Sequence, residues 1–250
     1  MNIITTEQTE AAASRASDER LTLAALERLV QQAEPAAILV PPRILRRVIK
    51  QDAGVRRLGL RVPHRKTYVI SRDDLLHIAS IGELDQPRGT QLTATVILIA
   101  RPAPEHLSSR PAADILLRVW RLLFHAKIHL ALDGLVESGR LGEKEVSRRI
   151  AALGEGAFSE IRLVLKAEDM LLAPADNVAV YTEFVAVYWE LRFLAPALLG
   201  AYFPALQHVD DVDAILEQDL NVVPLLEGTQ LPGAALPAAP DSLDLVPYEP

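Results

Sequence analysis

The sequence predicts a mainly α fold, in which an irregular antiparallel helical bundle is preceded by a small mixed α/β unit. Three observations favour this fold. Long segments with helical periodicity fill the second half of the chain, short extended runs are confined to the first half, and half of the 250 residues are apolar. A chain of this length and apolar content can bury a sizeable core.

The N-terminal part predicts a tail, a helix, a short extended run and a second helix. Residues 1–18 are small and polar, and we expect them to be disordered. Ser17 can cap a helix that Pro35 ends. The run Ala36 to Val40 is partly β-branched and is followed by two prolines. It therefore predicts a brief strand or an extended lead into a short basic helix over Arg43 to Gln51.

Three further extended runs are expected before residue 101. Leu58 to Val62 and Lys66 to Ile70 are separated by Pro63, His64 and Arg65, and would form a hairpin if they pair. Thr93 to Ala100, with the sequence TATVILIA, is the clearest strand in the chain. Its unbroken apolar run predicts burial on both faces of a sheet.

A short helix is expected between the last two of these runs. Ser71 can cap it, because Asp74 follows three residues later in the manner of a capping box. Gly82 is expected to end this helix.

The segment Ala112 to Ser138 predicts the longest and most regular helix, around which the rest of the chain is organised. Pro111 suits its first turn, and Gly139 suits the left-handed residue that ends a helix. A polar stripe shares one side of this helix and comprises Asp114, Arg118, Arg121, His125 and His129. Apolar residues at helical spacing lie on another side, so the helix is amphipathic.

The remaining chain is expected to be helical. Helices are predicted over Glu143 to Leu153, Phe158 to Leu172, Asn177 to Phe203 and Asp210 to Gln218. Pro196 should kink or divide the third of these. The links between the segments are short, which favours antiparallel neighbours in a bundle.

These elements suggest four regions. Residues 1–18 form the tail, 19–101 the α/β unit with its basic segment, 102–228 the bundle, and 229–250 a linker or tail rich in proline and alanine. The second and third regions are able to pack as one domain. A chain that ends in such a stretch is either complete or the N-terminal part of a larger protein.

Composition favours a cytoplasmic protein without a membrane segment. The chain contains no cysteine, which excludes disulfides and thiolate metal ligands. The N-terminus lacks the pattern of a secretory signal. The most apolar window, residues 184–203, is interrupted by Glu190, Arg192 and Pro196, so it does not predict a membrane span.

Charge is distributed unevenly along the chain. From Ile38 to Lys66 nine basic residues stand against Asp52 alone, whereas from Leu171 to Pro250 twelve acidic residues stand against Arg192 alone. The basic segment has the charge of a nucleic-acid-binding face, or of a surface that meets an acidic partner. The candidate residues of this face are Arg43, Arg46, Arg47, Lys50, Arg56, Arg57, Arg65 and Lys66.

His125 and His129 are one helical turn apart, which is the spacing of two histidines in helical metal sites. The residue after His125 is Ala126, so the glutamate of an HExxH motif is missing. Arg118 and Arg121 on the same stripe would repel a divalent cation. We therefore expect no metal and no cofactor, and retain a metal-dependent helical enzyme as an alternative.

Glu183 and Glu190 are seven residues apart on an apolar, aromatic helix. Carboxylates on a buried face need partners, and Arg118, Arg121 and His125 can supply them. We expect these side chains, together with His129, to form a structural polar network through which two long helices meet. A hydrolase with paired carboxylates is the functional alternative, although facing arginines fit ion pairing better.

No complete catalytic set is found: the sequence has no GxSxG motif and no phosphate-binding GxxxxGK[ST] loop. The first hypothesis is therefore a non-catalytic interaction or regulatory module whose partner is a protein. The alternatives are a nucleic-acid-binding protein that uses residues 43–66, and a metal-dependent enzyme at His125 and His129 with Glu183 and Glu190.

Overall fold

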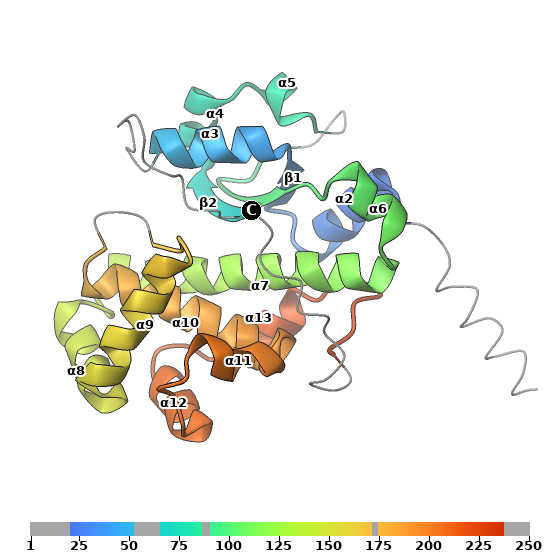
Figure 1. Cartoon of the computed structure of the whole chain (residues 1–250). Helices are drawn as coiled ribbons and strands as arrows, with labels where there is room; N and C mark the ends of the chain where they lie inside the picture. The colour runs from blue at the N-terminus through green and yellow to red at the C-terminus, as the bar shows by residue number, and fades with distance from the viewer. Residues whose placement is uncertain (1–20, 53–65, 87–90, 172–174, 238–250) are drawn as a thin grey trace, which may run out of the picture.

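The computed structural model describes residues 21–52, 66–86, 91–171 and 175–237. Within these ranges the chain forms twelve α-helices and one three-stranded sheet (Figure 1). The predicted fold class, mainly α with a small α/β unit, is confirmed.

The sheet is mixed, with the strand order β1-β3-β2. β1 (Ala37–Val40) runs parallel to β3 (Thr95–Ala100), and β2 (Thr67–Ser71) runs antiparallel to it. Ile97 at the centre of β3 is therefore opposite Ala37 on one side and Val69 on the other. The four central residues of β3 are buried, which confirms the predicted two-sided burial.

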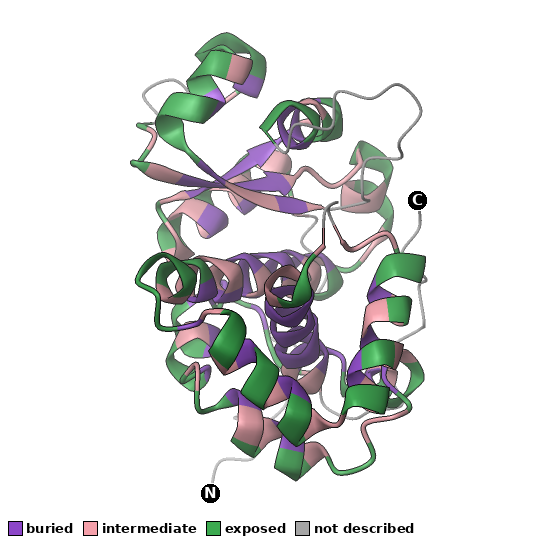
Figure 2. Ribbon diagram, turned by 90° about the vertical axis from the view of Figure 1, so that its left-hand side faces the viewer, coloured by how far each residue is buried: buried purple, intermediate pink, exposed green. Residues whose placement is uncertain are grey.

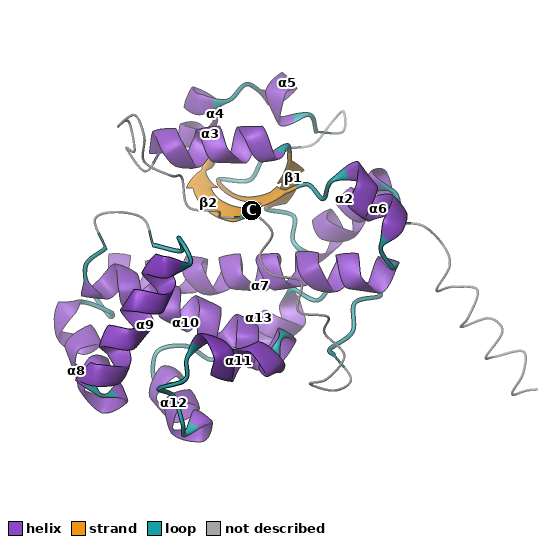
Figure 3. Ribbon diagram, viewed as in Figure 1, coloured by secondary structure: helices purple, strands orange, loops and turns teal. Residues whose placement is uncertain are grey.

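Alternation along β3 divides the core into two parts, because successive side chains point to opposite faces of a sheet. Val96 and Leu98 belong to a cluster with the apolar residues of α3 (Pro42–Asp52) and α4 (Arg72–Ile78). Ile97 and Ile99 belong to the core of the helical bundle. The sheet therefore lies between α3 and α4 on one face and α7 (Ala112–Glu137) on the other (Figure 3).

The first helix of the described residues, α2 (Leu23–Ala33), begins later than predicted. Its cap is Thr22, whose Oγ1 accepts a hydrogen bond of 3.2 Å from the backbone N–H of Ala25. The predicted cap, Ser17, lies outside the described residues. The hairpin also stays untested, because residues 58–62 are not described; the run Lys66 to Ile70 supplies β2.

Ser71 caps α4 as predicted, since its Oγ accepts a 3.1 Å hydrogen bond from the N–H of Asp74. The predicted end at Gly82 is wrong: α4 ends at Ile78, and Gly82 lies inside a further short helix, α5 (Ile81–Leu84). The cause is a second capping box, in which Ser80 and Glu83 satisfy each other's backbone N–H groups and start a new turn.

The helices after β3 follow the predicted order. After α6 (Pro104–Ser109), which was not predicted, come α7, α8 (Glu143–Leu153) and α9 (Glu155–Ala167). Gly139 and Gly154 have φ angles of 71° and 93°, which explains the two sharp turns between these helices. Because Gly154 makes its turn alone, α9 begins three residues before the predicted Phe158.

Pro196 divides the next segment, as predicted, into α10 (Asn177–Leu194) and α11 (Pro196–Tyr202). All residues of α10 from Val180 to Leu191 are buried. Figure 2 shows this helix as buried along most of its length in the middle of the bundle. The most enclosed helix is therefore α10, and α7 packs against it.

The C-terminal part of the described chain returns to α7. α12 (Val209–Leu216) and α13 (Val223–Gly228) are followed by Leu231 and Ala234, which are buried in the bundle core. The indole Nε1 of Trp120 on α7 lies 3.2 Å from Oγ1 of Thr229. The stretch expected to be a linker or tail thus begins with packed residues.

Two tyrosines fix α10 against its neighbours. The hydroxyl of Tyr181 donates a 2.6 Å hydrogen bond to Asp219, which pairs with Arg149 of α8 at 2.7 Å. The hydroxyl of Tyr188 donates a 2.5 Å hydrogen bond to Asp213 of α12. Burial is the main cause that raises the pKa of both phenols above the ordinary value of 10. The hydrogen bonds to carboxylates raise it further.

We expect Tyr181→Phe to lower the free energy of unfolding at pH 7 by about 1.5 to 3 kcal/mol, because it removes a hydrogen bond to a charged group. The raised pKa keeps the Tyr181 phenol protonated in the folded protein. The contribution of this phenol to the free energy of unfolding is therefore present below pH 10 and is lost as the pH rises further. Urea unfolding is measured at pH 7 and at a pH above 10. The free energy of unfolding should fall less between these two pH values in the variant than in the wild type.

Tyr68→Phe is the control. The hydroxyl of Tyr68 donates an exposed hydrogen bond to Asp52, so its loss should lower the free energy of unfolding by less. Two results would contradict this account: an equal loss of free energy of unfolding in both variants, or a dependence on pH above 10 that is the same in Tyr181→Phe as in the wild type.

Candidate metal centre

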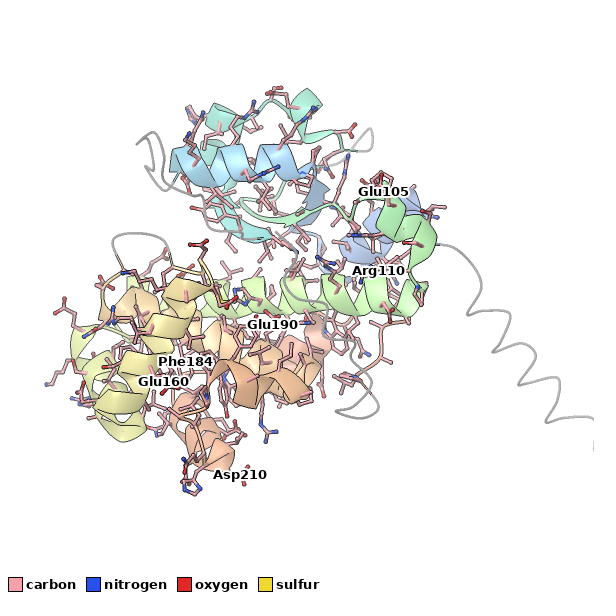
Figure 4. All side chains as sticks on the ribbon, in the orientation of Figure 1. Glu105, Arg110, Glu160, Phe184, Glu190 and Asp210 are labelled. Atoms are coloured by element: carbon pink, nitrogen blue, oxygen red, sulfur yellow. The ribbon has the colours of Figure 1, made fainter. Side chains whose placement is uncertain are left out.

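The candidate site lies where α7 and α10 pack against each other, and Figure 4 labels Glu190 at this seam. Arg121, His125 and His129 are spaced by four residues on α7, so they share one face of the helix. Arg121 meets Glu190 and His129 meets Glu183. Since the numbers rise along one helix as they fall along the other, the two helices run antiparallel at this contact.

Glu190 is held at both carboxylate oxygens. Its Oε1 accepts hydrogen bonds from Nη2 and Nε of Arg121, at 2.7 and 3.1 Å. Its Oε2 lies 3.0 Å from Nδ1 of His125. Burial by itself raises the pKa of Glu190, but the Arg121 charge and the His125 imidazole outweigh it and lower the pKa below its ordinary value. Glu190 is therefore a buried carboxylate with two partners on α7.

The two imidazoles and Glu183 converge on one point. Nε2 of His125 lies 3.1 Å from Nε2 of His129. Oε1 of Glu183 is 3.7 Å from the first of these nitrogens, and Oε2 is 3.3 Å from the second. One ligand atom from each of the three residues can be chosen so that all three lie within 4.8 Å of one another. Three groups that bind divalent cations thus present their electron-rich atoms to the same small volume.

The site is enclosed but reaches the surface at its imidazole end. Glu183 and Glu190 are 3% and 5% exposed. The side chains of His125 and His129 are 12% and 16% exposed. A carboxylate in such surroundings is stable only when positive charge or hydrogen-bond donors face it. Glu183 is placed where either protonated imidazole or a bound cation would balance it.

The spacing of these atoms is close to the spacing of ligands around a tetrahedral cation. Metal–ligand distances of about 2.0 to 2.1 Å place tetrahedral ligand atoms about 3.4 Å apart. The two imidazole nitrogens are 3.1 Å apart, and a different oxygen of Glu183 lies near each of them, at 3.7 and 3.3 Å. Coordination would therefore require the side chains to move until one of these oxygens faces both nitrogens.

The charge balance also tolerates a cation. Arg121, which was expected to repel one, is neutralised by Glu190. With both histidines neutral, Arg121, Glu190 and Glu183 sum to one negative charge. Arg118 lies three residues before Arg121 and is half-buried. Repulsion by Arg121 is thus weaker than the sequence suggested.

The structure describes only part of the basic segment. Arg43, Arg46 and Lys50 are exposed on α3, and Lys66 is half-buried. Arg56, Arg57 and Arg65 lie outside the described residues.

Acidic groups lie beside the described part of this segment. Arg47 pairs with Glu83 at 2.8 Å; this hydrogen bond, with those from Ser80, lowers the pKa of Glu83 to about 2. Asp73 and Asp74 are exposed on α4, which packs beside α3. Nucleic-acid binding by this segment stays a prediction.

The sequence did not show that Glu183 would face both imidazoles and that His125 would face both glutamates. A usable signal was present: the spacing of Glu183 and Glu190 matches two turns of the α7 stripe, as an antiparallel pairing requires. The anchors of α10 were also missed: Tyr188 bonds Asp213 of α12, and Tyr181 bonds Asp219, which follows α12. They join residues more than twenty positions apart without a shared pattern.

Comparison with protein-family models, curated proteins and solved structures gives no match. Among the described residues, no helix has both the length and the apolar character that crossing a bilayer requires.

We expect Arg121→Met to lower the free energy of unfolding by about 3 to 5 kcal/mol, because it leaves Glu190 as a buried charge with one partner fewer. Chemical denaturation at pH 7 measures this. Arg148→Met is the matched control: Arg148 forms an exposed pair with Glu145, and its loss should cost less than about 1 kcal/mol. Similar small costs for both variants would show that the Arg121–Glu190 pair does not stabilise the seam.

Proposed function

We propose that the protein binds one divalent transition-metal cation between α7 and α10. The ligands are Nε2 of His125, Nε2 of His129 and the carboxylate of Glu183. The observation that carries the proposal is the convergence of these groups: the two nitrogens are 3.1 Å apart, and the two oxygens of Glu183 lie 3.7 Å from the first and 3.3 Å from the second. Two histidines one turn apart on α7 and one glutamate from the facing helix complete a set that neither helix supplies alone.

The ligand chemistry favours zinc and similar ions. Imidazole nitrogen suits zinc, copper, nickel, cobalt and iron, whereas magnesium and calcium prefer oxygen ligands alone. The chain has no cysteine, so the cation is held by nitrogen and oxygen only. Three protein ligands leave a fourth position for water or another small ligand, as in zinc sites that bind or activate a ligand.

This proposal develops the metal-dependent alternative from the sequence without assigning a reaction. It is compatible with the first hypothesis, because a cation that joins two helices can serve a regulatory module. A protein partner and a cytoplasmic location remain part of the proposal, and the cysteine-free composition supports the location.

Titration of the metal-free protein with Zn²⁺, followed by isothermal calorimetry, tests the proposal. We expect one equivalent to bind. At free zinc one hundred times above Kd, the folded state gains about 2.7 kcal/mol. For a chain of this size that gain raises Tm by about 5 to 10 °C. Addition of a chelator should reverse the shift.

Substitution of the ligands locates the site. His129→Ala and Glu183→Gln should each abolish the stoichiometric binding and the Tm shift. His77→Ala is the matched control, because His77 is exposed on α4 and far in the sequence from the seam. Binding that persists in His129→Ala, or is lost equally in His77→Ala, would overturn the proposal.

A further inference from the structure

We infer that Glu190, held by Arg121, is a positioning residue that orients His125 for the cation and sets the affinity of the site. This inference rests on the proposed metal centre and explains why two buried carboxylates face the same pair of helical turns. Glu183 lies close to Nε2 of both histidines, whereas Glu190 lies close to Nδ1 of His125 alone. The two carboxylates therefore have different tasks.

Imidazole chemistry requires a group in the position of Glu190. A neutral histidine that binds a metal through Nε2 carries its proton on Nδ1, and this N–H is usually donated to a carboxylate or carbonyl. Nδ1 of His125 is buried and makes no well-aligned hydrogen bond, while Oε2 of Glu190 lies 3.0 Å from it. An N–H on Nδ1 can therefore be donated to this oxygen, which leaves Nε2 free to coordinate.

Arg121 makes this arrangement directional. The two hydrogen bonds from Arg121 to Glu190 both end at Oε1, at 2.7 and 3.1 Å, which leaves Oε2 for His125. The guanidinium also neutralises Glu190, so that carboxylate attracts a cation less than Glu183 does. Arg121 therefore holds Glu190, Glu190 orients His125, and His125 binds the cation. Glu183 and His129 supply the other two ligands.

Cobalt binding to the full chain separates positioning from coordination, because the visible absorption of Co²⁺ reports its ligands and geometry. We expect Glu190→Gln to weaken Co²⁺ and Zn²⁺ binding by about 10- to 100-fold, the usual effect of losing such a partner. The stoichiometry and the positions of the cobalt bands should stay as in the wild type, since the ligands are unchanged.

Arg121→Lys provides a second variant in case Glu190→Gln does not fold, which circular dichroism would show. Lysine keeps the charge but lacks the two-pronged contact, so Glu190 is held less firmly and affinity should fall by several-fold. Glu27→Gln is the matched control: Glu27 on α2 is a carboxylate whose side chain is 12% exposed and pairs with Arg101 at 3.1 Å. Its metal affinity should equal that of the wild type.

The outcomes are distinct. Unchanged affinity in Glu190→Gln, or in Arg121→Lys where that variant alone folds, would overturn the positioning role and leave the metal centre intact. Shifted cobalt bands in Glu190→Gln would show that Glu190 is itself a ligand, which also overturns this inference. No cobalt or zinc binding by the wild type would overturn the metal centre and, with it, the inference.

Discussion

Two carboxylates buried on one helix are the constraint on which the seam between α7 and α10 depends. Glu183 and Glu190 lie in a stretch of α10 where every residue from Val180 to Leu191 is buried. An uncompensated charge there would cost more free energy than most single contacts contribute. The polar face of α7 meets this cost with Arg121 and two imidazoles. The pairing also fixes how the two helices are offset along their axes.

The rest of the fold holds this seam in place from both sides. β3 directs Ile97 and Ile99 into the same core as α7, which ties the α/β unit to the bundle. On the other side, Tyr181 and Tyr188 anchor α10 to Asp219 and Asp213. α10 therefore has little freedom to rotate, and its two glutamates stay directed at α7. Such a rigid support is what a site needs to hold its ligands at coordination distance.

Sequence patterns predicted local features such as helix bounds and missed the contacts between residues that are distant in the sequence. Periodicity placed α8 at its observed bounds and put Arg121, His125 and His129 on one face of α7, because residues four apart share a helix face. It could not predict that His125 would face both glutamates, since spacing within one helix does not give the offset of its partner. The error at Gly82 arose because the Ser80 and Glu83 box outweighed a glycine that helices tolerate.

The most direct test of the metal centre is anomalous diffraction from a crystal grown with Zn²⁺, recorded above and below the zinc absorption edge. We predict one anomalous peak at the seam, about 2.0 to 2.2 Å from Nε2 of His125, Nε2 of His129 and an oxygen of Glu183. Zinc bound elsewhere, with no peak at the seam and the two imidazoles still 3.1 Å apart, would contradict the account.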